Sequence, residues 1–291
     1  MVDHNPPKVS VCIPTYNYAH YLPDAVGSVL AQTFPDYELV VVDNCSTDKT
    51  PDIVRKYIDS GAKIRYYRNE RNVGQTGNFN LCLKYAAGDY IKILCADDLL
   101  EPACLEKLVS AMESHPRASL AGSARMLVND SLRPLKVLSY SDRFVEDNGF
   151  NVIKRCLLKG NLIGEPTSVL FRKIHAERGF TTTYKQLIDL EMWFHLLEQG
   201  DFVFLPEPLS KFRRHEGQLT WEYIKDPAFF GDGWRIFNEY IDKDYVRMSA
   251  VRKSLLKVIR RGGMELLRRS HLARFAFSTL QAKVTARRHH V

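Results

Sequence analysis

The sequence lacks the closely spaced cysteines that a zinc site or a disulfide framework requires. Its six cysteines are scattered without a CxxC pair, and most of them lie within apolar segments that have strand or helix patterns. We expect these cysteines to be buried, reduced thiols. The chain is therefore not predicted to be a small disulfide-stabilised domain or to hold a structural zinc ion.

Long apolar runs are also missing. No run approaches the roughly 18 to 20 residues that a membrane-spanning helix needs, and residues 1–7 contain no apolar stretch of the signal-peptide kind. On this basis we expect a cytoplasmic protein. With 291 residues and 45% hydrophobic content, the chain can form one sizeable core, or one core and a smaller appended region.

Acidic residues are almost absent from one end of the chain. Residues 246–291 hold twelve Lys or Arg and one acidic residue, Glu265, which gives this segment a net charge of +11. Because the net charge of the whole chain is +7, the remaining residues have a net charge of −4. Because no nucleic-acid motif accompanies these basic residues, we expect no nucleic-acid partner. Apolar residues recur at helical spacing over 246–261 and again over 266–284. Such a tail can lie peripherally on the anionic inner face of a membrane or pack on the protein body, and a homodimer is compatible with its apolar side.

The chain does contain a regular alternation of strand-like and helix-like segments over residues 8–116. Apolar strand-like runs begin at Val9, Tyr37, Ile64 and Tyr90, and helical patterns separate them. This order predicts an α/β fold with a doubly wound, mainly parallel sheet and helices on both faces.

The rhythm changes after residue 116. Strand patterns at 119–128, 137–140, 167–171, 202–206 and 209–212 indicate a mixed or antiparallel extension that completes the site, with a helix over 187–198. After residue 220 almost every pattern is helical. We therefore predict a catalytic domain over 1–219, with a nucleotide-binding half at 8–116 and an acceptor half at 117–219, and a helical, basic C-terminal extension over 220–291.

Polar residues directly follow three of the first four predicted strands. After the first strand come Pro14 and the polar residues Thr15, Tyr16 and Asn17. Asp43 and Asn44 follow the second strand, and Asp97 and Asp98 follow the fourth. The carboxyl ends of parallel strands share one edge of a sheet, where a Tyr ring can stack on a base and an acidic pair can hold Mg²⁺ or Mn²⁺ on a diphosphate. Arg71, Asn72 and Gly74 form a loop that can add a cation and amide donors. This pattern favours a sugar-nucleotide enzyme, and the alternative is an ordinary turn in which Asp98 caps the next helix.

Four blocks of the sequence, in order, resemble the signatures of family 2 glycosyltransferases. The blocks are VSVCIPTYN at 9–17, VVVDNCSTD at 40–48, RNVG at 71–74 and ADD at 96–98. The resemblance covers roughly residues 8–216 and implies a GT-A fold with inverting sugar transfer from a nucleotide-diphosphate sugar, most often a uridine diphosphate (UDP) sugar. It also implies that Thr15, Tyr16, Asp43 and Arg71 bind the nucleotide, and that Asp97 and Asp98 occupy the metal motif.

The chain departs from the family at Cys95, where many members have a further Asp. This leaves a site with two carboxylates and leaves open which of Asp97 and Asp98 touches the metal. A scaffold that binds a nucleotide-sugar without turnover is therefore a second hypothesis. A nucleotidyltransferase is a third, although no Gly-rich loop with Arg and Lys follows the first strand.

The acceptor half carries two further segments similar to the family. Asp189, four residues before Trp193, matches the position of the catalytic base. Glu191, on another face of the same predicted helix, is a candidate acceptor or phosphate contact. At 212–220 the resemblance implies that a His approaches the metal or diphosphate. His215 is the candidate, with Arg213 or Arg214 as phosphate partners. The alternatives are a helix-capping Asp189 and a surface His215. The acceptor is expected to be a saccharide or a lipid-linked saccharide.

Overall fold

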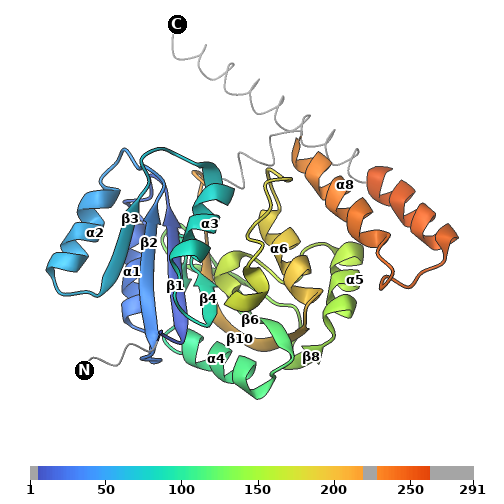
Figure 1. The fold of residues 1–291 in the computed structure, drawn as a ribbon, viewed down its shortest axis with the longest axis horizontal. Coiled ribbons are helices and arrows are strands. Elements are labelled where there is room, and N and C mark those ends of the chain that lie inside the picture. The colour runs from blue at the N-terminus through green and yellow to red at the C-terminus, as the bar shows by residue number, and fades with distance from the viewer. Residues whose placement is uncertain (1–5, 219–227, 263–291) are drawn as a thin grey trace, which may run out of the picture. The chain divides into compact units, whose positions relative to one another are not determined.

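The computed structural model describes residues 6–218 and 228–262, and the chain separates into two compact units (Figure 1). The first unit comprises residues 1–183 and 188–215, and the second comprises 184–187 and 216–291. All the candidate site residues that the sequence singles out belong to the first unit. The predicted tail segment at 266–284 lies outside the described residues.

The amino-terminal half of the first unit alternates strands and helices in the order that the sequence predicts. The elements are β1 (Val9–Thr15), α1 (Leu22–Leu30), β2 (Tyr37–Asp43), α2 (Thr50–Asp59), β3 (Ile64–Arg68), α3 (Gly74–Tyr85), β4 (Tyr90–Ile93), β5 (Leu99–Leu100) and α4 (Cys104–Ser114). Strand β1 pairs in parallel with both β2 and β4, and β2 pairs in parallel with β3. The parallel, doubly wound sheet is therefore confirmed.

The second half of this unit extends the same sheet with strands of both directions. Its elements are β6 (Ala118–Asn129), β7 (Pro134–Leu138), β8 (Val145–Asp147), α5 (Gly149–Lys159), η1 (Pro166–Ser168), β9 (Val169–Arg172), η2 (Lys173–Ala176), α6 (Ile188–Leu197) and β10 (Asp201–Arg214). The strand order is β3-β2-β1-β4-β9-β6-β10-β5, with β7 beside β6 and β8 beside β10. Because β9 is antiparallel to both β4 and β6, strands β6 and β10 run in the same direction as β4.

The side chains of β1 and β2 show why both faces of the sheet must be covered. Val9, Val11 and Ile13 belong to a core that includes α1, α2 and α4, whereas Cys12, on the opposite face, lies against α3, with its Sγ 3.6 Å from the Cys82 carbonyl oxygen. Alternate residues of each strand thus pack on different helix layers. The sheet between two helix layers can be followed in Figure 1.

Three local differences from the sequence prediction affect the site. Residues 202–212 form part of one continuous strand, β10, instead of two, because β-bulges at Leu205–Ser210 absorb the proline-containing interruption without ending the pairing with β6. Thr167 and Ser168 lie in the 3₁₀ turn η1 and not in a strand. Helix α5 was not predicted, although its buried apolar residues recur at helical spacing.

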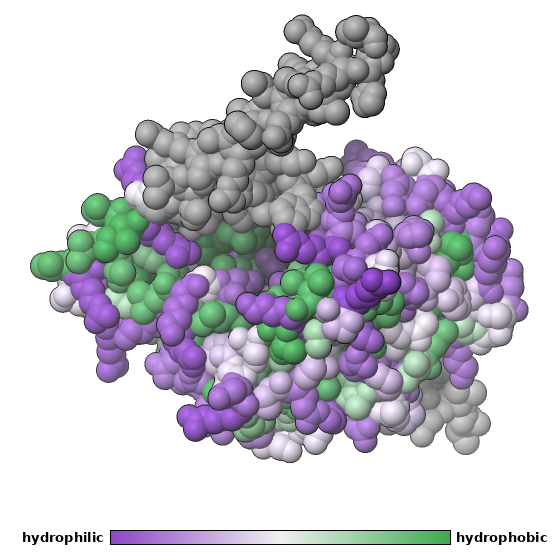
Figure 2. Space-filling view, turned by 180° about the vertical axis from the view of Figure 1, so that it is seen from behind, coloured by the Kyte–Doolittle hydropathy of each residue, from purple (hydrophilic) through white to green (hydrophobic). Residues whose placement is uncertain are grey.

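The second unit is helical in its described part. It contains α8 (Ala228–Ile241) and a further helix over 250–262. The Asp232 carboxylate accepts hydrogen bonds from the backbone N–H groups of Lys185 and Gln186, which joins the segment 184–187 to α8. Apolar side chains of helix 250–262 face solvent, where Figure 2 shows hydrophobic surface at the left edge. None of the described helices is both long enough and apolar enough to cross a membrane.

Candidate active site

The candidate site lies at the edge of the sheet where the parallel strands end. Thr15 ends β1, Asp43 ends β2, Asp97 follows β4 and His215 follows β10. Since these strands run in the same direction, their carboxyl ends meet at one edge, which is where open α/β sheets bind their ligands. Strand β9 runs the opposite way, so the turn η1 that precedes it also reaches this edge.

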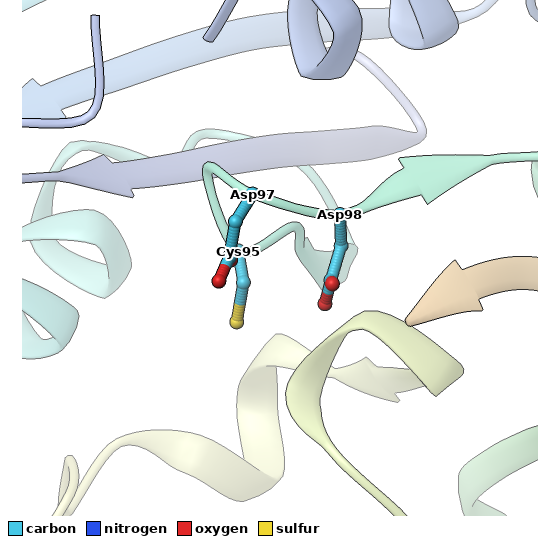
Figure 3. A group of neighbouring side chains, drawn as sticks. All are labelled: Cys95, Asp97 and Asp98. Atoms are coloured by element: carbon cyan, nitrogen blue, oxygen red, sulfur yellow. The ribbon is translucent and has the colours of Figure 1, made fainter. Parts of the chain in front are cut away.

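The loop after β4 brings a thiol and two carboxylates together. Ligand atoms of Cys95, Asp97 and Asp98 all lie within 4.8 Å of one another. Figure 3 shows the three side chains extending in the same direction from the loop. Oxygen ligands suit Mg²⁺ and Mn²⁺, whereas a thiol suits softer metals, so the two carboxylates are the chemically relevant part of this cluster.

Asp98 is held inside the protein. Its side chain is completely buried, and its two oxygens accept hydrogen bonds from the Thr167 hydroxyl at 2.6 Å and from the backbone N–H of Arg213 at 2.9 Å. Burial, with a contribution from neighbouring Asp97, raises the pKa of Asp98 well above its usual value, while both hydrogen bonds act to lower it. Asp98 therefore connects the β4 loop to η1 and to the end of β10.

Asp97 has a different partner. Its Oδ2 lies 3.0 Å from Nε2 of His215, and both side chains are largely buried. The His215 ring also packs against the rings of Tyr21 and Tyr18, at centroid distances of 4.5 and 5.9 Å. The two side chains are therefore hydrogen-bonded to each other, and their oxygen and nitrogen atoms are both of kinds that bind divalent cations. The residues present thus fit a divalent cation held between Asp97 and His215.

A buried lysine supports the same loop from beneath. Lys92 on β4 has no exposed surface, and its Nζ donates hydrogen bonds to the carbonyl oxygens of Thr167 at 2.6 Å and Val169 at 3.1 Å. The Thr167 hydroxyl in turn accepts a hydrogen bond from the backbone N–H of Cys95 at 3.2 Å and donates to Asp98. Lys92 and Thr167 therefore fix the shape of the loop that presents Asp97.

Asp189 lies in the first turn of α6, in electrostatic reach of the β4 loop. Its negative charge is among the causes that raise the pKa of the Cys95 thiol, after burial, Asp98 and Asp97. Burial raises the pKa of Asp189 itself to about 6, with a further contribution from Glu165, against a hydrogen bond at 2.8 Å from the backbone N–H of Leu190. A carboxyl group of this kind is well suited to accept a proton near neutral pH.

The sequence analysis offered three residues as acceptor or phosphate contacts, and their surroundings in the structure differ. These residues are Glu191, Arg213 and Arg214. Both oxygens of buried Glu191 accept hydrogen bonds from the Arg178 guanidinium, at 2.8 Å each. The buried Arg213 side chain contacts Asp24 at 2.6 Å and lies over the Tyr21 ring. The charged groups of Glu191 and Arg213 are thus engaged with other side chains of the protein. Arg214 is exposed.

The polar residues after β2 organise the nucleotide-side loops. Asp43 is fully buried, and its carboxylate accepts hydrogen bonds from the Ser46 N–H at 2.8 Å and the Tyr66 hydroxyl at 2.7 Å. The Asn44 amide donates to Asn72 at 2.8 Å and accepts from the Val73 N–H at 2.9 Å, which shapes the loop before Gly74.

The loop after β1 is tied to the loop after β2. Asn17 has a positive φ of 57°, and its side-chain oxygen accepts a hydrogen bond from the Thr47 N–H at 2.8 Å. Asn tolerates this left-handed conformation better than most residues, so a local reason favours Asn at this position. Asn17 thus joins the ends of β1 and β2.

Three other candidates offer a buried hydroxyl and two exposed side chains. Within the described part of the chain, the Thr15 hydroxyl is buried without a hydrogen-bond partner, although Pro14 and Thr15 are otherwise ordinary strand residues. Tyr16 is 41% exposed, and Arg71 is exposed on its loop. A buried hydroxyl without a partner costs free energy, so a bound molecule that satisfies it fits this site.

Four residues that shape the site were missed by the sequence analysis. They are Lys92, Thr167, and the ion pair between Arg125 and Glu165, whose Nε and Oε2 lie 2.6 Å apart. A lone lysine within the apolar run of β4 was a usable signal, because a buried charge requires partners. The others have no local signal, since their roles come from contacts with distant parts of the chain.

Comparison with solved structures defines the class of protein first. The fold is similar to that of Staphylococcus aureus TarS in complex with UDP-GlcNAc, with a TM-score of 0.68 and 22% identity, over 86% of this chain and 70% of that one. It is also similar to the Pyrobaculum calidifontis mannosyltransferase PcManGT in complex with GDP-Man and Mn²⁺, with a TM-score of 0.62 and 19% identity, over 97% and 81% of the two chains. The fold is therefore that of GT-A glycosyltransferases.

The sequence then places the chain within that class. The profile of Glycosyl transferase family 2 matches residues 10–178, more than half of the chain, and the chain belongs to this family. A relative from Escherichia coli, the UDP-Glc:alpha-D-GlcNAc-diphosphoundecaprenol beta-1,3-glucosyltransferase WfgD, is 27% identical over 242 residues, which span 82% of this chain and 89% of that protein. The resemblance seen in the sequence is confirmed at the level of family and fold.

Proposed function

We propose that this glycosyltransferase moves a sugar from a UDP-sugar to a hydroxyl group of a saccharide acceptor, with inversion at the anomeric carbon and with a divalent cation on the diphosphate. The observation that carries the proposal is the arrangement of three side chains at one sheet edge. Asp97 and His215 are hydrogen-bonded to each other and offer an oxygen and a nitrogen ligand for a divalent cation, and the charge of Asp189 acts on the Cys95 thiol of the same loop. Cation, leaving group and base are thus given places in one site.

The donor is assigned to the half of the site formed by β1, β2 and the loop before α3. Tyr16 offers an exposed ring on which a base can stack, Thr15 offers a buried hydroxyl, and Arg71 offers an exposed guanidinium for phosphate oxygens. Asp43 and Asn44 hold these loops in place. The complex of TarS with UDP-GlcNAc supports the choice of a uridine nucleotide.

The cation is assigned to Asp97 and His215. A Mn²⁺ or Mg²⁺ ion held by these two residues would supply positive charge to offset the negative charge of a departing diphosphate. Asp98 holds the loop through Thr167 and Arg213, and its two oxygens are turned toward those groups. The complex of PcManGT with Mn²⁺ supports a divalent metal in this fold.

Asp189 is assigned the role of base. The acceptor hydroxyl oxygen attacks the anomeric carbon while the bond from that carbon to the diphosphate oxygen breaks, and its electron pair leaves with the diphosphate. The hydroxyl proton passes to the Asp189 carboxylate. A pKa of about 6 keeps most of this group ionised at pH 7 while leaving it basic enough to take the proton.

The acceptor is proposed to be a saccharide linked to a lipid diphosphate. WfgD, which shares most of its length with this chain, is named for such an acceptor. The sugar and the linkage follow from the shape of the acceptor half and are left to experiment.

A screen of sugar nucleotides tests the proposal. The purified chain is incubated with UDP-, GDP- and TDP-sugars with Mn²⁺ or with a chelator, and release of the nucleoside diphosphate is measured with and without lipid-linked saccharide. We expect release from a UDP-sugar that depends on the metal and increases with acceptor. Metal-dependent binding without any release would instead support a scaffold, and release of pyrophosphate from a nucleoside triphosphate would support a nucleotidyltransferase.

A further inference from the structure

The helix over residues 250–262 exposes the side chains that a helix in water normally buries. Val251, Leu255, Val258 and Ile259 are 79%, 57%, 69% and 59% exposed. Their spacing of four, three and one residues places them on one arc of the helix, because each residue turns the chain by about 100°. Figure 2 shows the hydrophobic surface where this helix lies.

The opposite side of the helix carries most of its contacts within the second unit. Leu256, Lys257 and Arg260 are partly buried. The Lys257 ammonium group lies 2.6 Å from the Asp242 carboxylate, and the Arg260 guanidinium lies over the Phe237 ring of α8 at 5.7 Å. Two charged side chains of the helix thus contact protein while its apolar arc faces out, which reverses the usual order for a surface helix.

The surroundings of the apolar arc are strongly basic. Residues 246–262 contain six Lys or Arg and no Asp or Glu. Arg247, Arg252 and Arg261 are exposed on this segment. A second copy docking through the same arc would bring these like charges together, whereas an anionic surface would pair with them.

We propose that helix 250–262 docks on an anionic lipid bilayer, with its apolar arc in the acyl boundary and its exposed arginines at the headgroups. Apolar arcs of this kind enter about 5–10 Å into the interface, and each basic residue near an anionic leaflet adds about 1 kcal/mol. The helix lies in the plane of the interface, consistent with the lack of any spanning helix among the described residues.

The proposal concerns binding and not chemistry, so it does not rest on the proposed transfer reaction. If both hold, docking brings the catalytic unit to the surface that contains a lipid-linked acceptor. A protein that binds vesicles without transferring sugar would overturn only the proposed function. A protein that transfers sugar to a soluble acceptor without binding vesicles would overturn only the docking.

Co-sedimentation with vesicles tests the docking. The full chain is mixed with vesicles of phosphatidylcholine alone or with phosphatidylglycerol, at low and high salt. We expect sedimentation with the anionic vesicles that decreases with salt, and little with the neutral ones. Equal sedimentation with both vesicle types, or with neither, would overturn the proposal.

Two variants and two matched controls separate the contributions of the apolar and the basic side chains to vesicle binding. Leu255→Gln combined with Val258→Asn should weaken vesicle binding at least about tenfold, and Arg252→Glu combined with Arg261→Glu should do the same and remove the salt dependence. Val137→Asn on β7 and Arg143→Glu, which change exposed residues of the first unit, should leave binding unchanged. Because all the changed residues are exposed, the melting temperatures should match wild type.

A copy of the same chain is the alternative occupant of the arc, and size-exclusion chromatography detects it. Conversion of a dimer to a monomer by the Leu255→Gln and Val258→Asn pair, with vesicle binding unchanged, would overturn the lipid assignment. A wild-type chain that elutes at the same volume as this variant, while only wild type binds vesicles, would support it.

Discussion

The carboxylates of the site differ in their surroundings between the loop after β4 and the first turn of α6. In the loop, Asp98 is held by the Thr167 hydroxyl and the Arg213 backbone, and Asp97 is held by His215. In the helix, the Asp189 carboxylate accepts a hydrogen bond from the neighbouring Leu190 N–H, and burial raises its pKa to about 6. In the proposed mechanism, the first region supplies position, which a cation site needs, and the second supplies basicity, which proton transfer needs.

Removing the basic carboxylate should have the largest effect. We expect Asp189→Asn to lower kcat by about 10²–10⁴, because the acceptor hydroxyl loses its base, while metal-dependent donor binding stays at the wild-type level. Steady-state kinetics and donor titration measure the two quantities. A variant that loses donor binding together with turnover would place Asp189 with the donor and break the comparison.

The same substitution should stabilise the fold. A raised pKa means that the folded state resists ionisation of Asp189, so a neutral amide should increase the free energy of unfolding at pH 7 by roughly 1–3 kcal/mol. Urea denaturation of wild type and variant measures the difference. An unchanged or lower stability at pH 7 would show that the ionised carboxylate is well accommodated, contrary to the contrast drawn above.

Weakening the positioning network should have an intermediate effect. Thr167→Val leaves the buried Asp98 without one of its two hydrogen bonds and should cost about 1–3 kcal/mol of stability, with a smaller loss of metal-dependent donor affinity. Thr181→Val is the matched control, since the Thr181 hydroxyl pairs with Thr183 in an exposed position. If both variants melt at the wild-type temperature, Thr167 does not hold the loop.

The pH dependence of turnover and of stability should further distinguish the first turn of α6, which carries Asp189, from the loop after β4. Turnover should fall about tenfold per pH unit below about pH 6, where Asp189 becomes protonated. The pKa of Asp189 in the folded state, about 6, lies above its ordinary value of 3.8, so between about pH 4 and pH 6 the folded protein binds more protons than the unfolded chain. The contribution of Asp189 to stability therefore decreases as pH rises through this range. The stability difference between Asp189→Asn and wild type should therefore grow from about pH 4 to pH 6. A difference independent of pH would contradict the assignment.

The smallest effect is expected at Cys95. Cys95→Ser preserves shape and removes the soft ligand, so turnover with Mn²⁺ should change by less than about threefold if Asp97 and His215 bind the cation. A large loss with Mn²⁺, measured as initial rates across metal concentrations, would make the thiol a ligand.

The residues at the strand ends could be predicted from the sequence for a physical reason. Apolar runs that end in polar residues identify buried parallel strands, and parallel strands share one edge, so Thr15, Asp43 and Asp97 were placed together without coordinates. The local pattern also identified the helix that carries Asp189. His215 was suggested by the family resemblance, and its position follows from the parallel pairing of β10 with β6.

The separate roles proposed for the charged residues of the site could not be predicted in the same way. Whether Asp97 or Asp98 faces the cation depends on Thr167 and Arg213, which lie 69 and 115 residues from Asp98 in the sequence. Glu191 and Arg213 were offered as ligand contacts because they lie in segments that resemble the family, and the structure pairs them with Arg178 and Asp24. Charge alone does not distinguish a group that binds a ligand from one that is neutralised within the fold.

Calorimetric titration of UDP in the presence and absence of Mn²⁺ tests the central claim most directly, with wild type, Asp97→Asn and Asp189→Asn compared side by side. We predict that Mn²⁺ strengthens UDP binding to wild type and to Asp189→Asn equally, and that this strengthening is lost in Asp97→Asn. Full metal-dependent strengthening in the Asp97→Asn variant would contradict the account, because the cation would then bind elsewhere.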